Sequence, residues 1–204
     1  MPSLTPTASS TVGPFYGYAL PFPGGERLAP EGHPDRVTLH GYVRDGAGEP
    51  VPDALLEFWQ VAPDGSLAGA PGSLRRDPVT GGFLGRDTIR FTGFGRVATD
   101  ADGHYAVHTL TPGNPGNPGN PGNPGNPGNP GNPGQPHLAI AVFARGLLHH
   151  LYTRVYLRDG PDPLLDRLPA DRRATLIAAE EPYRVHRFDI RLQGEGETVF
   201  LEFP

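Results

Sequence analysis

The chain has 204 residues, of which 36% are hydrophobic, and this suits one domain of the larger β type built around a single core. It contains no cysteine, which excludes disulfides, zinc-cysteine sites, iron-sulfur clusters and thiol nucleophiles, and which fits a reducing cytoplasm. Its 17 basic residues are all arginines, scattered among acidic residues at a net charge of -5, so a nucleic-acid surface is not expected. There is no signal-like start and no apolar run of about 18 residues, so we expect a cytoplasmic protein without membrane contact.

Residues 1–36 precede the first strand-like pattern and are predicted to form an N-terminal arm, while residues 37–204 are predicted to form one domain. From Val37 onward, short apolar or alternating runs are separated by turn residues, which is typical of an all-β sandwich or barrel. VTLHGYV and ALLEFWQV are the first predicted strands. Residues 100–103 then predict a hairpin turn between two strands, because Asp and Gly supply the hydrogen bonds and positive φ that tight turns need.

The segment 113–136 repeats a Gly-Asn-Pro triplet eight times, with Gln135 in the last copy. None of its side chains can ionise or bury much apolar area, so we expect a solvated loop insertion without chemistry of its own. A longer loop costs little extra closure entropy, so a β domain can tolerate such an insertion.

The second half of the chain predicts further strands and one or two short helices. LAIAVFARG and HHLYTRVYL form the next predicted strand pair, joined near Gly146. The stretch 163–182 combines apolar residues at helical spacing with prolines that divide it, which predicts the helices. In the closing passage Arg187, Asp189 and Arg191 alternate with apolar residues, which predicts a half-buried strand, then a glycine turn and a final strand.

The residue pattern by itself indicates no complete metal or catalytic site. His104 and His108 share one face of a predicted strand, but they lie about 13 Å apart along it, too far to share one ion. The adjacent His149 and His150 point to opposite faces of their strand. No Gly-x-Ser-x-Gly elbow and no phosphate-binding loop is present.

Three passages nevertheless resemble the intradiol ring-cleaving dioxygenases. They are TPTASSTVGPFYGYALPF near the start, LEFWQVAPDGS in the middle, and VFARGLLHHLYTRVYL with YRVHRFDIRLQGEGETVFLEF at the end. Within this family they are similar to the alpha subunit of the two-subunit enzymes that cleave protocatechuate. The resemblance implies a β-sandwich core and an alpha-beta heterodimer in a larger oligomer, with the N-terminal arm at the subunit interface. It also implies opening of protocatechuate (3,4-dihydroxybenzoate) by O2 to 3-carboxy-cis,cis-muconate.

The same resemblance implies where iron would be bound. The family's ferric ion is held by two tyrosinates and two histidines, because hard anionic oxygens stabilise Fe(III) and imidazoles complete the site. The tyrosine positions correspond here to Leu67 and to the repeat near Pro115, and the second histidine corresponds to Ala139. His137 is the one remaining match, and Gly134 stands where the catalytic subunit has an arginine. We therefore expect no iron and no catalytic residue in this chain, with Fe(III) held by a partner beta subunit.

Parts of this chain are expected to complete the substrate pocket of that beta subunit. The resemblance assigns substrate binding to Arg145 and to Thr11, Gly13, Pro14 and Phe15 of the arm. A guanidinium is a suitable counter-ion for the carboxylate of protocatechuate, through a charge-assisted hydrogen bond worth about 1.5 to 3 kcal/mol. Phe15 stands where a tyrosine is common in relatives, so a hydroxyl contact is lost there.

Two other interpretations remain open from the sequence. One is a self-sufficient dioxygenase with rearranged ligands, such as His137 with Tyr152 or His150. The other is a β-sandwich binding module that has lost its catalytic partner and presents the proline-rich tract to aromatic-lined grooves. The favoured interpretation is the non-catalytic alpha subunit, inactive alone and active with its beta subunit.

Overall fold

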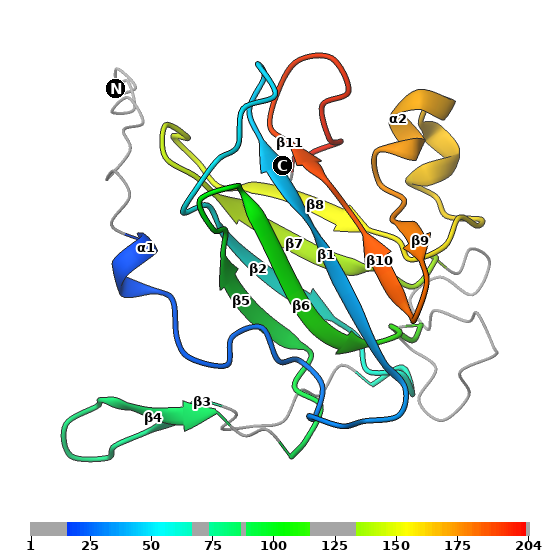
Figure 1. The fold of residues 1–204 in the computed structure, drawn as a ribbon. Coiled ribbons are helices and arrows are strands. Elements are labelled where there is room, and N and C mark those ends of the chain that lie inside the picture. Colours follow the sequence, from blue (N-terminus) through cyan, green and yellow to red (C-terminus); the bar gives the residue numbers. More distant parts are fainter. Residues whose placement is uncertain (1–15, 67–73, 87–88, 115–133, 203–204) are drawn as a thin grey trace, which may run out of the picture.

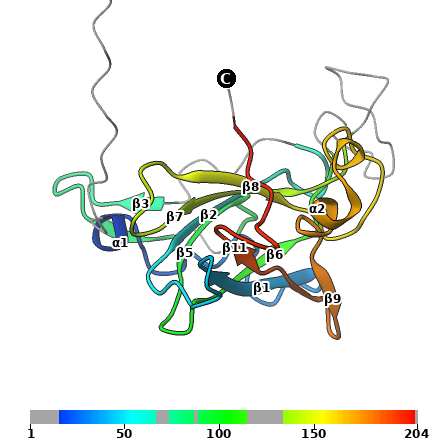
Figure 2. The same ribbon diagram turned by 90° about the horizontal axis from the view of Figure 1, so that it is seen from above.

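The structure is a computed structural model that describes residues 16–66, 74–86, 89–114 and 134–202. Within these residues two β-sheets pack face to face as a sandwich (Figure 1, Figure 2). Helical structure in the described part is limited to two short α-helices and one 3-10 turn. The all-β prediction is therefore confirmed. None of the described helices is long and apolar enough to cross a membrane.

The elements follow one another in a fixed order along the chain. They are α1 Tyr16–Ala19, β1 Arg36–Arg44, β2 Leu55–Gln60, β3 Leu74–Arg76, β4 Phe83–Arg86, β5 Phe94–Ala98, β6 His104–Leu110, β7 Leu138–Phe143, β8 Leu151–Val155, η1 Leu165–Arg167, α2 Ala170–Ala174, β9 Ala179–Glu181, β10 Val185–Arg187 and β11 Ile190–Arg191.

The first sheet is built around β1. β6 pairs with one edge of β1 in antiparallel fashion, while β10 and β11 pair with its other edge in parallel fashion. β9 extends the sheet beyond β10. Residues along β1 alternate between buried and partly exposed, so one face of this sheet lies in the core and the other faces outward.

The second sheet has the order β5-β2-β7-β8, and its neighbouring strands are all antiparallel. β7 and β8 pair as predicted, and Gly146 in their connection has a φ of +87°. The inward faces of the two sheets supply the main core, which includes Leu39, Val43, Leu56, Phe58, Tyr105, Val107, Ile140, Val142 and Val155. η1 and α2 confirm the predicted short helices, whereas α1 was not predicted.

The predicted turn at residues 100–103 is present, but it does not make a hairpin. The Asp100 N–H donates to the His104 carbonyl at 2.9 Å, and the Gly103 N–H donates to the Asp100 carbonyl at 3.0 Å. The strands on either side belong to different sheets, because β5 pairs with β2 and β6 pairs with β1. The turn therefore carries the chain across the sandwich.

The closing passage also differs from its prediction. The half-buried strand is divided into β10 and β11, and the predicted final strand is reduced to one bridge between Tyr152 and Leu201. At the division, the Phe188 carbonyl accepts a hydrogen bond from the Tyr105 hydroxyl at 2.6 Å, and the Asp189 carboxylate accepts one from the Tyr42 N–H at 3.1 Å. These side-chain bonds interrupt the ladder along β1.

Candidate functional site

The outward face of the second sheet carries most of the predicted site residues that the structure describes. Along β7, Leu138, Ile140 and Val142 fill the core, so the residues between them point outward. His137 comes just before β7 and Arg145 follows just after it. The predicted match to an iron-ligand position and the predicted pocket arginine therefore lie at opposite ends of one strand, about 26 Å apart along the chain.

At the first of these ends, the His137 ring is held in place by a hydrogen bond and by packing against another ring. Its Nδ1–H donates to the Gln135 carbonyl at 2.9 Å, and its ring lies 5.4 Å from the ring of Tyr156, measured between centroids. Burial lowers the pKa of His137, and the Arg154 guanidinium lowers it further. Burial also raises the pKa of Tyr156 to about 12. At neutral pH the imidazole is therefore uncharged and the phenol is protonated.

The residues around His137 do not fit a ferric ion. Ala139, at the second histidine position, lies across from Arg154 in the β7–β8 ladder, so a cation stands beside the place where iron would bind. The tyrosine positions hold Leu67 and Pro115, which have no donor atoms in their side chains and lie outside the described residues. Across the described ranges, no three His, Asp or Glu side chains are grouped closely enough to hold a metal ion. One neutral imidazole next to a guanidinium cannot replace two tyrosinates as ligands of Fe(III).

The structure also places Tyr152 and His150 far from His137, with which they were considered as ligands of a rearranged iron site. Tyr152 lies across from Ala141, four residues along β7 from His137, or about 13 Å. The His150 ring stacks on Phe143 with 5.2 Å between centroids, about 20 Å along the strand from His137. One ion cannot bridge these side chains in this fold.

Arg145, at the second end of β7, forms an ion pair with Asp53. Its side chain is still 59% exposed. Tyr16 of α1 lies beside Phe143, with 6.2 Å between ring centroids. Burial and the Asp53 carboxylate raise the pKa of Tyr16, while Arg145 opposes this effect, so the Asp53–Arg145 pair lies within electrostatic range of the Tyr16 hydroxyl.

The predicted arm residues Thr11, Gly13, Pro14 and Phe15 lie outside the described residues, and their roles stay predictions. Phe15 is bonded directly to Tyr16, the first described residue. The segment assigned to substrate binding therefore joins the described chain at a residue that packs beside Phe143 and whose pKa is influenced by Arg145.

Two large aromatic residues are exposed on this sheet face. Trp59 was missed from the sequence, and Tyr152 was considered there only as a possible ligand of a rearranged iron site. Trp59 is 55% exposed and Tyr152 is 41% exposed. Trp59 packs on Phe94 and lies across from Ala139, while Tyr152 contacts the His150 ring edge on. Exposed aromatic side chains on a sheet face are typical of protein interfaces. The alternation in LEFWQ could have revealed Trp59, because it puts Glu57 and Trp59 on the face opposite the buried Phe58.

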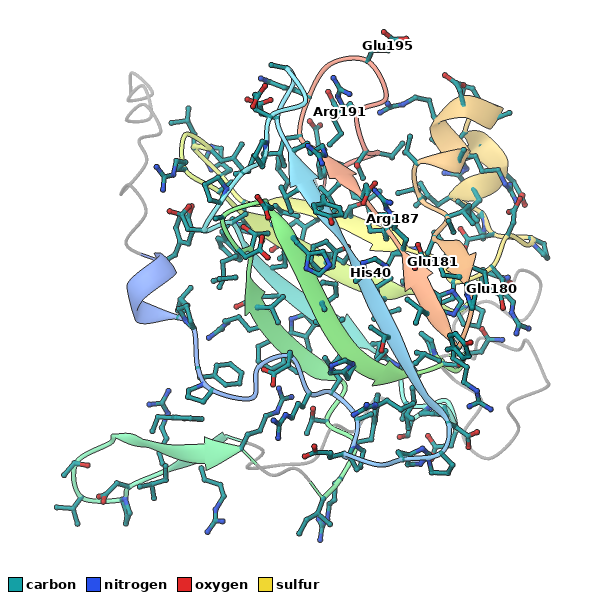
Figure 3. All side chains as sticks on the ribbon, in the orientation of Figure 1. His40, Glu180, Glu181, Arg187, Arg191 and Glu195 are labelled. Atoms are coloured by element: carbon teal, nitrogen blue, oxygen red, sulfur yellow. The ribbon has the colours of Figure 1, made fainter. Side chains whose placement is uncertain are left out.

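The outward face of the first sheet is different in character, because its charged groups largely satisfy one another. Nδ1 of His40 lies 3.2 Å from Nε2 of His104, and Nε2 of His40 lies 3.1 Å from the Glu181 carboxylate. Arg187 pairs with Asp189 at 2.9 Å. His40, Glu181 and Arg187 extend from neighbouring strands in Figure 3.

Comparisons with known proteins agree with this geometry. Residues 12–194 match the family model described as "Dioxygenase". The protocatechuate 3,4-dioxygenase alpha chain of Burkholderia cepacia is 39% identical over 223 residues, covering 99% of this chain and 100% of that one. The beta chain from the same organism is 28% identical, covering 80% of this chain and 67% of that one.

A solved structure shows the same fold at lower identity. It is the dioxygenase domain of a dioxygenase carbohydrate-binding protein fusion from Streptomyces sp. SirexAA-E, which is 24% identical with a TM-score of 0.53, covering 83% of this chain and 87% of that one. The family model spans most of this chain, and the alpha-chain relative spans nearly all of it. The chain therefore belongs to the intradiol ring-cleaving dioxygenase family.

Proposed function

We propose that this chain is the non-iron-binding alpha subunit of a protocatechuate 3,4-dioxygenase, and that it completes the substrate pocket of an iron(III) beta subunit. The observation that carries the proposal is the contrast between the two ends of β7. The His137 end has lost the donors that ferric iron needs, while the Arg145 end keeps an exposed guanidinium beside the arm. The similarity to an alpha chain over nearly the whole length supports the same assignment.

The proposed partner covers the outward face of the second sheet. Trp59 and Tyr152 are exposed on this face between the two ends of β7, and their aromatic surface suits burial against another chain. The beta-chain relative belongs to the same family as this chain, so the two subunits would be two copies of one sandwich with different loops. The iron, O2 and the ring-cleaving chemistry would then belong to the beta subunit.

Arg145 is proposed to bind the carboxylate of protocatechuate. Asp53 holds the guanidinium from one side, and the guanidinium has five N–H donors in a fixed fork, a geometry suited to binding a carboxylate. The contribution of such a bond is about 1.5 to 3 kcal/mol, which corresponds to a tenfold to hundredfold change in affinity.

The test is co-expression of this chain with a beta subunit, compared with this chain alone, followed by assays of bound iron and of protocatechuate-dependent oxygen uptake. We expect iron and activity only in the mixture. In the complex, Arg145→Gln should raise the KM for protocatechuate at least tenfold and that for catechol, which lacks the carboxylate, much less.

Arg167→Gln is the matched control, because Arg167 is an exposed arginine of η1 outside the proposed site. It should leave both KM values unchanged. Iron and turnover in the lone chain would contradict the subunit assignment, and equal effects of Arg145→Gln on the two substrates would contradict the carboxylate contact.

A further inference from the structure

A cavity of about 580 Å³ opens at the end of the sandwich where β1 begins and β6 ends, the opposite end from Arg145. Its floor is made by the buried residues Val37, Leu110 and His186. Its rim carries four exposed charged residues, Asp35, Arg158, Glu180 and Arg184. A volume of this size with an apolar floor and a few convergent polar groups is typical of small-molecule sites.

His186 is the unusual group in the floor. It lies in β10 between the buried Leu39 of β1 and Glu180 of β9, and only 7% of its surface is exposed. Its Nδ1 atom is buried and has no hydrogen-bond partner in the described part of the chain. Buried polar atoms nearly always have a partner, and none of the described residues supplies one to this atom, so a bound ligand is a candidate partner. Burial lowers the pKa of His186, and a neutral ring can donate at one nitrogen and accept at the other.

The charges on the rim are only partly compensated. Arg184 pairs with Asp35 at 3.0 Å and also donates to the Pro34 carbonyl at 3.1 Å. Arg158 and Glu180, by contrast, form no ion pair with any residue that the structure describes. Both are near enough to act on the charge of the His186 ring, with opposite sign. Among the described residues, Arg158 is thus a cation and Glu180 an anion without an ion-pair partner, above a floor that includes the apolar Val37 and Leu110; Glu180 is labelled in Figure 3.

We propose that this cavity binds a small organic acid that carries a hydrogen-bond donor at its other end. Its carboxylate pairs with Arg158, its hydroxyl or amino group donates to Glu180, and its apolar body rests on Val37 and Leu110. A polar group of the ligand then supplies the missing partner of His186 Nδ1. A simple anion would leave Glu180 uncompensated, so a ligand with both groups fits better than either group alone. This site uses none of the residues of the proposed subunit interface.

The probe is 3-hydroxybenzoate, which combines a carboxylate, a ring and a hydroxyl. Calorimetric titration of the full chain, as it purifies alone or with its beta subunit, measures the affinity. The titration is done in the Arg145→Gln background, so that binding near Arg145 contributes little. Benzoate lacks the hydroxyl and 3-hydroxybenzamide lacks the charge, so each removes one of the proposed contacts.

We expect saturable binding of 3-hydroxybenzoate, and weaker binding of both comparison ligands. Arg158→Gln should lower the affinity for 3-hydroxybenzoate about tenfold, because a charge-assisted hydrogen bond is lost. Glu180→Gln should lower the affinity for 3-hydroxybenzoate about threefold to tenfold and leave the affinity for benzoate unchanged. Arg167→Gln should change neither affinity. The absence of saturable binding at millimolar concentration, or binding that Arg158→Gln leaves unchanged, would overturn the site. The subunit assignment is tested separately, because it depends on iron and oxygen uptake.

Discussion

At the scale of single residues, His137 shows how the fold accommodates the residue that the resemblance matches to an iron ligand. Its Nδ1–H is engaged by the Gln135 carbonyl, its ring packs on Tyr156, and Arg154 is close enough to disfavour a positive charge on it. Burial and the Arg154 charge favour a neutral ring, and together they outweigh the Gln135 carbonyl, which favours the charged form. The buried setting and the Arg154 charge would also oppose a bound cation, in addition to the residues that replace the other expected ligands.

His137 should make the stability of the chain depend on pH. Its folded-state pKa lies below the ordinary value of 6.5, so the unfolded chain binds more protons than the folded one as the pH falls through that region. The stability that the neutral ring contributes is present above the unfolded-state pKa and is lost as the pH falls toward the folded-state pKa. In His137→Asn, where an amide can still donate to Gln135, the free energy of unfolding should fall less between about pH 7.5 and pH 5.5 than in the wild type.

Urea unfolding at the two pH values measures this difference. The free energy of unfolding of His137→Asn should still fall somewhat as the pH falls, because burial also lowers the pKa of His108 and of His186. His149→Asn, at an exposed histidine, serves as the control and should keep the wild-type decline. A decline in His137→Asn as steep as that of the control would contradict the prediction.

At the scale of elements, the contact between β1 and the link from β10 to β11 fixes the first sheet. Gly41 of β1 lies against Phe188, and the Phe188 carbonyl also accepts the hydrogen bond of the buried Tyr105 hydroxyl. A Cβ atom on Gly41 would lie 1.9 Å from that carbonyl oxygen. The glycine is therefore required by close backbone approach.

Gly41→Ala should destabilise the chain by about 2 to 4 kcal/mol, because either β1 or the β10–β11 link must move and the Tyr105 hydrogen bond is strained. Thermal or urea unfolding measures the change. Gly17→Ala is the matched control, since nothing lies within 4 Å of a Cβ atom there. A loss below about 1 kcal/mol in Gly41→Ala would show that the link yields easily.

At the scale of the whole molecule, the repeat lies between strands of different sheets. β6 of the first sheet ends at Leu110, and β7 of the second sheet begins at Leu138. The connection between them occupies the place of a loop that would supply an iron-binding tyrosine, according to the resemblance. Residues 115–133 lie outside the described residues, so the expectation of a loop without chemistry stays a prediction.

Halving the tract from eight triplets to four should change the free energy of unfolding by only about 0.6 kcal/mol, because closure entropy varies with the logarithm of loop length. Oxygen uptake by the complex with a beta subunit should also be unchanged. Unfolding measurements and the oxygen assay on the shortened chain test both statements. A change of several kcal/mol, or loss of activity, would mean that the tract makes specific contacts.

The sequence by itself determined the fold class and the family, and it predicts the loss of the iron ligands. Alternation and turn residues report which side chains are buried, and this information is local, so the all-β architecture, the β7–β8 pair and the short helices were predicted correctly. The identity of a side chain at a ligand position is a chemical fact that needs no coordinates. Leu67, Pro115 and Ala139 cannot supply the tyrosinate or imidazole donors of a ferric site.

Only the tertiary structure decided which strands pair and which side chains meet. The turn at residues 100–103 looks the same locally whether it closes a hairpin or crosses between sheets, because the choice depends on the distant partners β1 and β2. The grouping of Tyr16, Asp53 and Arg145 likewise depends on contacts between segments far apart in the chain. So does the cavity above His186, whose lining comes from strands of the first sheet and from the loops that follow β2, β6 and β8. The local sequence pattern determines whether a side chain points into the core or toward solvent. Packing between distant segments determines which residues that side chain contacts.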